Sequence, residues 1–287
     1  MQQDSPETAS DHYPPVETHL ISSTHAARAF KVQVMQPARK KEEATRFPVV
    51  YATDGNLAFE MFKGISRVIQ SPECDASRFI LVGIGYAGNG PYASETLRAR
   101  DLIFPGYPEL SREAPPGGAQ NFQHFIEHEL IPFIDERYAT IPGDRSYFGH
   151  SAGGGFGLYT LFTKSDVFKN YIISSPGLIY HGRSPAGVNY ENYDFVLQEA
   201  RRFIACAKPL SDIRVYMSVG TEEEYEPAFA QWQLTSSFYR MTALLKAAAI
   251  PGLELMTEAF AGETHLTVWP MAFIHGVRAV FGKGHRS

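Results

Sequence analysis

A serine set among glycines, after an apolar run and before a helix-like run, constrains the fold of this chain most. The segment is RSYFGHSAGGGFGLYTLF, residues 145–162, in which Gly149–Gly153 fits the pattern G-x-S-x-G around Ser151. Residues 144–148 predict a short strand and residues 157–164 predict a helix, the context that a nucleophile elbow requires. Small flanking residues are needed because such a serine has a strained backbone and larger side chains would collide with the neighbouring strand. The motif predicts a nucleophilic serine on a tight turn, and a flexible glycine loop is the alternative.

The rest of the chain alternates short apolar runs with longer segments of helical period. This order is typical of βα units around a mostly parallel sheet, so the fold class is α/β. We expect a flexible tail over residues 1–15 and one catalytic domain over residues 16–287. Irregular insertions near 86–118 and 177–193 are expected on the substrate side, because long loops are uncommon unless they are functional. The expected strands are 27–35, which enters antiparallel, 47–53, 78–85, 144–148, 170–176, 213–220 and 253–260, and the expected helices are 57–69, 121–138, 157–164, 195–207 and 268–281.

Charge and hydropathy argue against several classes of partner. The net charge is −5, and the one basic run, residues 39–41, is followed at once by two glutamates, so a nucleic-acid partner is not expected. The first twenty residues contain neither a basic n-region nor an apolar h-region, and no run of about 18 apolar residues occurs. The two cysteines, Cys74 and Cys206, lack the paired spacing of a zinc site. We expect a cytoplasmic protein without a membrane partner, whose oligomeric state these features leave open.

A nucleophilic serine needs a base, and the base needs an acid that holds its tautomer. On this type of sheet the chain order is serine, acid, histidine, each on a loop after a strand. His265 follows the expected strand 253–260, whereas His275 lies inside a helix and His150 adjoins the serine in what we interpret as a structural position. The strand 213–220 delivers three adjacent carboxylates, residues 222–224, which cannot all be buried. His265 is therefore the predicted base, with one of these three glutamates as its acid.

Several segments together resemble the esterase D and enterochelin-esterase branch of the α/β-hydrolases. They are VVYATDG, NFQHFIEHELIPFIDERY, YFGHSAGGGFGLYTLF, SVGTEEE and GETH, and the likeness runs from about residue 24 to residue 282. The resemblance implies an α/β-hydrolase fold, a mostly parallel sheet flanked by helices on both faces, with a serine-histidine-acid apparatus and no cofactor or metal. It places Glu223 first among the three glutamates. It also implies an oxyanion hole made by the backbone N–H groups of Asn56 and Ala152.

The same resemblance narrows the substrate class to small-molecule esters. Members of this group cleave siderophore trilactones, simple acyl esters or S-formylglutathione, and some transfer acyl chains. The stretch LRARDLIFP, residues 97–105, resembles an Arg/Asp segment of the siderophore-esterase branch, so Arg100 and Asp101, together with Tyr86, are candidate substrate-binding residues. Alternatively, this loop packs its own aromatic side chains.

Three other functions fit parts of the sequence. HFIEH, residues 124–128, matches H-x-x-E-H of some zinc proteases, but the helix already has an amphipathic role and a third ligand is needed. GIGYAG, residues 83–88, matches a dinucleotide fingerprint, but Asn-Gly-Pro follows in place of a helix. A non-catalytic binding protein on the same fold is the third alternative. We predict a serine esterase that works through an acyl-enzyme, with an acyltransferase or a thioesterase of the S-formylglutathione type as alternatives.

Overall fold

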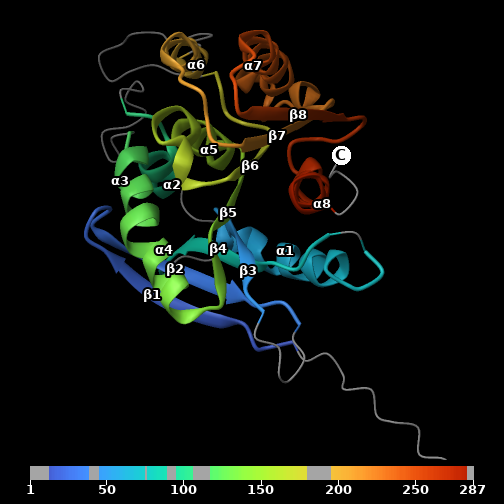
Figure 1. Ribbon diagram of the computed structural model, residues 1–287. Helices are drawn as coiled ribbons and strands as arrows, with labels where there is room; N and C mark the ends of the chain where they lie inside the picture. Colours follow the sequence, from blue (N-terminus) through green and yellow to red (C-terminus); the bar gives the residue numbers. More distant parts are fainter. Residues whose placement is uncertain are drawn as a thin grey trace, which may run out of the picture.

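The fold is organised around one mixed sheet. The computed structural model describes residues 13–38, 45–74, 76–88, 95–105, 117–179 and 195–282. In this part of the chain eight strands pair in the order β1-β2-β4-β3-β5-β6-β7-β8 (Figure 1). The first two pairings, β1 with β2 and β2 with β4, are antiparallel, and all later ones are parallel. The strands are β1 Glu17–Ser23, β2 Arg28–Met35, β3 Phe47–Ala52, β4 Ile80–Tyr86, β5 Thr140–His150, β6 Asn170–Ser174, β7 Ile213–Gly220 and β8 Leu253–Phe260.

Helices cover both faces of this sheet, as the resemblance implies. Figure 1 shows α1 Gly55–Ile69 and α8 Val268–Phe281 on one side. The other face carries α2 Glu95–Leu102, α3 Ala119–Phe125, α4 Ile131–Arg137, α5 Ala152–Thr163, α6 Phe195–Cys206 and α7 Leu234–Ala248. A π-helical turn, Ile126–Leu130, joins α3 to α4. The α/β-hydrolase fold predicted from the sequence is confirmed.

The strand sequences explain why two helical layers are needed. Successive side chains of a strand point to opposite faces, so an apolar run with both faces covered fills two cores. In β3, Val49 and Tyr51 belong to the core under α3 to α7, whereas Val50 and Ala52 belong to the core under α1 and α8. All six residues of β3 are buried. Central strands of this kind therefore read as continuous apolar runs in the sequence.

Three elements were missing from the sequence prediction. Strand β1 was not expected because it is an edge strand with exposed side chains, among them Leu20 at 69% exposed. Helix α7 was not expected, although parallel β7 and β8 require a crossover between them. Helix α2 lies inside the stretch 86–118 that was expected to be irregular. The predicted helix 121–138 is interrupted by the π-helical turn.

The remaining expectations about organisation are tested only in part. Residues 1–12 of the expected tail lie outside the described residues. The same holds for residues 89–94 and 106–116 of the first expected insertion. Residues 180–194, which include most of the second expected insertion, also lie outside the described residues. That residues 16–287 form a single domain stays a prediction. Among the helices that the structure describes, none has the length and apolar character needed to cross a membrane.

Candidate active site

The candidate site lies where parallel strands end side by side. Strands β3, β5, β6, β7 and β8 are neighbours in this order, so their carboxyl ends meet at one edge of the sheet. Asn56 follows β3, Ser151 follows β5, Glu223 follows β7 and His265 follows β8. In open α/β sheets this edge is where ligands bind. The tertiary structure thus brings to one edge of the sheet four predicted residues that lie up to 209 positions apart in the sequence.

Ser151 occupies the sharp turn that its motif predicts. Its backbone angles, φ of 58° and ψ of −119°, lie in a region that residues other than glycine rarely adopt. Its backbone N–H donates to the carbonyl of Ser174 at 3.0 Å, which fixes the turn to β6. Helix α5 starts at Ala152, so Ser151 directly precedes the first N–H groups of that helix. A Cβ at Gly154 would lie 2.8 Å from the carbonyl oxygen of Ser174, so the glycines here permit close packing.

Of the three adjacent carboxylates, the structure brings Glu223 to His265. The Nδ1 atom of His265 is 2.7 Å from Oε2 of Glu223, and both residues are buried, Glu223 completely. The other oxygen, Oε1, accepts hydrogen bonds from Oγ of Ser175 at 2.5 Å and from the backbone N–H of Gly220 at 2.6 Å. Both oxygens of the Glu223 side chain therefore have hydrogen-bond partners, as buried polar groups require.

The neighbouring glutamates are placed differently. Glu222 and Glu224 are both half-buried. Oε1 of Glu224 accepts hydrogen bonds from the backbone N–H and the hydroxyl of Ser236, which ties it to α7. The expectation that the three carboxylates are not all buried is confirmed. That Glu223 acts as the catalytic acid stays a prediction, now with direct contact to the predicted base.

His265 has contacts that sequence reasoning missed. Its backbone N–H donates to Oε2 of Glu226 at 2.8 Å. Its ring centroid lies 4.4 Å from that of His150 and 4.3 Å from that of Phe229. No local signal marks Phe229, whereas Glu226 follows the acidic run 222–224 after one intervening residue, Tyr225. His275, the rejected alternative, lies in α8 with Nδ1 3.1 Å from Glu258.

The turn after β3 carries the predicted oxyanion residue Asn56. Asp54 caps α1 in the left-handed conformation with φ of 58°. Its carboxylate accepts two hydrogen bonds from the guanidinium of Arg98, at 2.8 and 3.3 Å. The side chain of Asn56 donates to the carbonyl of Tyr86 at 3.0 Å and accepts from the N–H of Tyr86 at 2.5 Å. These contacts fix the start of α1 against β4 and α2.

Two of the three predicted substrate-binding residues are buried. Asp101 is 2% exposed and accepts a hydrogen bond from Arg28 at 2.9 Å. Burial raises its pKa to about 6, although Arg28 opposes the shift. Tyr86 is 5% exposed with its hydroxyl 3.4 Å from the carbonyl of Leu97, and burial raises its pKa well above the usual value. Arg100 is exposed, and its guanidinium donates a hydrogen bond to the carbonyl of Ala26 at 3.4 Å. Their role toward a substrate stays a prediction.

The segment GIGYAG is not arranged as a dinucleotide loop. Its first four residues belong to β4, where a fingerprint would form a turn. A Cβ at Gly85 would lie 2.3 Å from Oδ1 of Asn56, so this glycine is explained by the close approach of that side chain. The glycine therefore serves the candidate site.

In the structure the two histidines of the segment HFIEH lie close to a third histidine, His25. His124 and His128 lie with their ring centroids 5.5 and 5.6 Å from that of His25. Within the described ranges, no group of three His, Cys, Asp or Glu side chains is arranged to hold a metal ion. Cys74 and Cys206 are free thiols.

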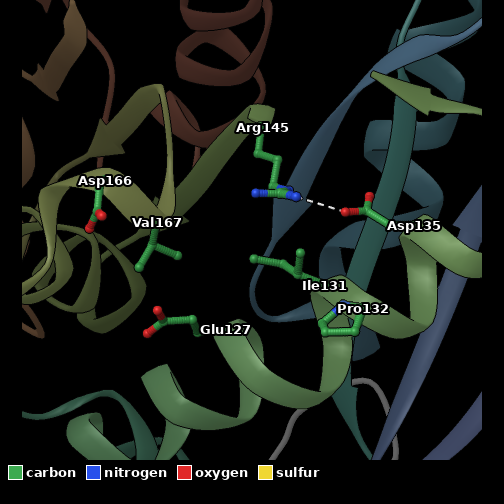
Figure 2. Close-up of a pocket in the computed structure, with 7 residues that line it drawn as sticks. All are labelled: Glu127, Ile131, Pro132, Asp135, Arg145, Asp166 and Val167. Carbon is green, nitrogen blue, oxygen red and sulfur yellow. Dashed lines mark hydrogen bonds and ion pairs between the residues drawn. The ribbon is translucent and has the colours of Figure 1, made fainter. Parts of the chain in front are cut away.

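A pocket of about 410 Å³ lies elsewhere, as Figure 2 shows. Asp166 and Val167 of its lining precede β6, and Asp135 precedes β5, so the pocket lies toward the amino ends of these strands. Arg145 points across it to Asp135, with Nη2 2.7 Å from Oδ2 (Figure 2). This pocket is at the opposite sheet edge from Ser151 and is not part of the candidate site.

Comparisons with known proteins cover nearly the whole chain. Residues 23–280 match the model of an esterase family described as "Putative esterase". The ferri-bacillibactin esterase BesA of Bacillus subtilis (strain 168) is 28% identical over 275 residues, which are 92% of this chain and 89% of that protein. The siderophore triacetylfusarinine C esterase of Aspergillus fumigatus is 26% identical over 272 residues, 88% of each chain. The crystal structure of BES protein from Bacillus cereus has 26% identity and a TM-score of 0.75, with 97% of each chain covered. The family match includes all the strand ends that form the candidate site.

Proposed function

Because this chain belongs to that esterase family, we propose that it hydrolyses carboxylic esters with Ser151 as nucleophile, His265 as base and Glu223 as acid. The observation that supports this most is the buried contact of 2.7 Å between Glu223 and His265, at the strand ends beside the strained turn of Ser151. A carboxylate on Nδ1 keeps the proton on that nitrogen, so Nε2 can accept a proton from a hydroxyl.

The proposed reaction has two halves. The Oγ atom of Ser151 attacks the ester carbonyl carbon while Nε2 of His265 takes the hydroxyl proton. The tetrahedral intermediate collapses, the ester C–O bond breaks, and the imidazolium gives its proton to the leaving alcohol. Water then attacks the acyl-enzyme with the same histidine as base, which releases the acid and restores the serine.

The negative oxygen of each tetrahedral intermediate needs donors. We assign this role to the backbone N–H groups of Ala152, at the start of α5, and of Asn56, at the start of α1. The start of a helix favours negative charge because its first N–H groups have no intrahelical acceptors. The Arg98 to Asp54 ion pair and the Asn56 to Tyr86 hydrogen bonds support the second donor by fixing its turn.

For the substrate we propose an ester of the siderophore class. The support is that two relatives matched along most of their length are named as esterases of ferri-bacillibactin and of triacetylfusarinine C. Arg100, which is exposed beside the buried Asp101, is the proposed contact for an anionic substrate. Short acyl esters and S-formylglutathione are the alternative substrates, which the second experiment below compares with a trilactone. Acyl transfer is tested by adding an alcohol acceptor to the reaction.

The first experiment tests the nucleophile with a fluorophosphonate probe and with p-nitrophenyl acetate. Wild-type protein is expected to be labelled at Ser151, and Ser151→Ala and His265→Ala should each lose nearly all hydrolysis. His275→Ala is the matched control and should leave activity unchanged, because His275 lies in α8 with its Nδ1 against Glu258 of β8. Full hydrolysis by Ser151→Ala would refute the mechanism.

The second experiment compares short p-nitrophenyl esters, S-formylglutathione and an iron-loaded trilactone as substrates. A kcat/KM for the trilactone above that for the other two supports the siderophore class. The cytoplasmic location expected from the sequence is likewise a proposal, which cell fractionation tests.

A further inference from the structure

The ring of His265 is contacted by two other rings that the mechanism above does not use. His150 comes from the end of β5, with its ring centroid 4.4 Å away and its plane tilted by 35°. Phe229 comes from the segment between β7 and α7, with its centroid 4.3 Å away and a tilt of 47°. Centroid separations this short bring ring faces into contact. We propose that His150 and Phe229 are positioning residues that hold the imidazole of His265 in its reactive orientation, an inference that rests on the proposed function.

His150 is itself fixed on several sides. Its Nδ1 atom is hydrogen bonded to Oγ of Ser174 at 2.9 Å, and its ring stacks on Trp269 with centroids 4.7 Å apart and planes 18° apart. It is 3% exposed. The carbonyl of the same Ser174 accepts the N–H of Ser151 at 3.0 Å. One residue of β6 therefore anchors both the proposed nucleophile and the ring that contacts the proposed base.

His150 is suited to this position because it stays uncharged. Burial lowers the pKa of His150 well below its usual value, and the nearby His265 and Arg98 lower it further. An uncharged ring can stay in contact with His265 when that residue becomes an imidazolium during the reaction. A charged ring at the same distance would repel it.

Phe229 belongs to a segment that contacts His265 at three places. Glu223 binds Nδ1, Glu226 accepts the backbone N–H, and Phe229 lies against the ring. The three residues lie within seven positions of the sequence, in and beside two short 3-10 turns. Two hydrogen bonds fix Nδ1 of the ring and the main chain, and the remaining rotation of the ring about its Nδ1 contact is restrained by packing. The aromatic contacts supply that packing.

The test compares Phe229→Ala with Phe229→Tyr, measured as kcat and KM for ester hydrolysis. Because displacement of a reacting group by about 1 Å can cost roughly 100-fold in rate, we expect Phe229→Ala to lower kcat by about 10- to 100-fold with KM nearly unchanged. Phe229 is half-buried, so the hydroxyl of Phe229→Tyr can reach solvent and kcat should return to within about twofold of wild type. Tyr225→Ala is the matched control, because this aromatic residue of the same segment is 79% exposed.

His150→Phe and Ser174→Ala test the other ring. His150→Phe keeps a flat ring and loses the bond to Ser174, whereas Ser174→Ala loses that bond alone, so both should lower kcat more than they raise KM. If neither variant folds, the Phe229 pair decides the matter. Full kcat in Phe229→Ala, or a loss confined to KM, overturns the proposal. If Ser151→Ala is inactive and Phe229→Ala is fully active, only the proposed positioning role is refuted. If Ser151→Ala is active, the proposed function itself is refuted.

Discussion

Glu223→Gln separates the orienting role of Glu223 from its role in packing, because glutamine has nearly the same shape. The two oxygens of Glu223 face different partners. Oε1 receives the N–H of Gly220 at 2.6 Å and the hydroxyl of Ser175 at 2.5 Å, and Oε2 faces Nδ1 of His265 at 2.7 Å. Only the carbonyl oxygen of a glutamine can replace Oε1, since an amide NH₂ there would meet the backbone N–H of Gly220.

The NH₂ group of that glutamine must therefore point at His265. It then donates to Nδ1, which forces the imidazole proton onto Nε2, the nitrogen that should accept the proton of Ser151. An equivalent change of tautomer in a serine protease lowers kcat by roughly 10⁴-fold. At about 1.4 kcal/mol for each tenfold change, this corresponds to about 5.5 kcal/mol of transition-state stabilisation. We expect a loss of that size with little change in the unfolding free energy.

The assay is kcat/KM for p-nitrophenyl acetate, with urea unfolding measured on the same protein. Glu222→Gln and Glu224→Gln are the matched controls and should stay within about twofold of wild type. Neither neighbour should rescue Glu223→Gln, because Glu224 is bound to Ser236. A Glu223→Gln enzyme that keeps more than a tenth of wild-type activity would refute the argument from tautomers.

Three further predictions concern the scaffold of the site. Gly149→Ala would place a Cβ 2.2 Å from the carbonyl oxygen of Gly153, so it should cost about 1–3 kcal/mol of unfolding free energy and most of the activity; urea unfolding as stable as wild type would contradict this. Arg98→Met leaves the buried carboxylate of Asp54 without its 2.8 Å partner and should cost about 3–5 kcal/mol, which an unchanged thermal midpoint would exclude. Burial raises the pKa of Asp101 from 3.8 to about 6, so its contribution to stability is fully present below pH 3.8 and is lost as the pH rises through 6. Asp101→Asn should abolish that loss and change the pH slope of the unfolding free energy by about one proton in this range, whereas identical slopes would disprove the assignment.

Local sequence patterns were sufficient to predict the bounds of the strands and helices that have a strong apolar periodicity. Strands 213–220 and 253–260 and helix 268–281 have the bounds that the sequence predicts. Their apolar patterns are long and their ends are marked by glycine or polar residues. Helix α7 was missed, although parallel strands on either side of it imply a crossover.

Some residues of the candidate site could likewise be predicted from local sequence patterns, and others could not. Ser151 could be predicted as the nucleophile because glycine spacing, a strand and a helix all lie within about twenty residues, and His265 could be predicted as the base because it follows the last strand. Residue types alone could not choose among Glu222, Glu223 and Glu224, which have almost the same local sequence; the choice came from family resemblance. Phe229 and Glu226 carry no local signal that relates them to a histidine some forty residues later.

The sequence by itself determined most of the strands and helices, with the exception of β1, α2 and α7, and it determined the strained serine turn and the loop that carries the histidine. These depend on backbone geometry and on apolar periodicity, which act between near neighbours in the chain. Only the tertiary structure decided that Glu223, which the resemblance places first, contacts His265, which rings contact that histidine, and that Tyr86 and Asp101 are buried. Those properties depend on which strand ends lie side by side, and the pairing of distant strands is set by the packing of the whole sheet.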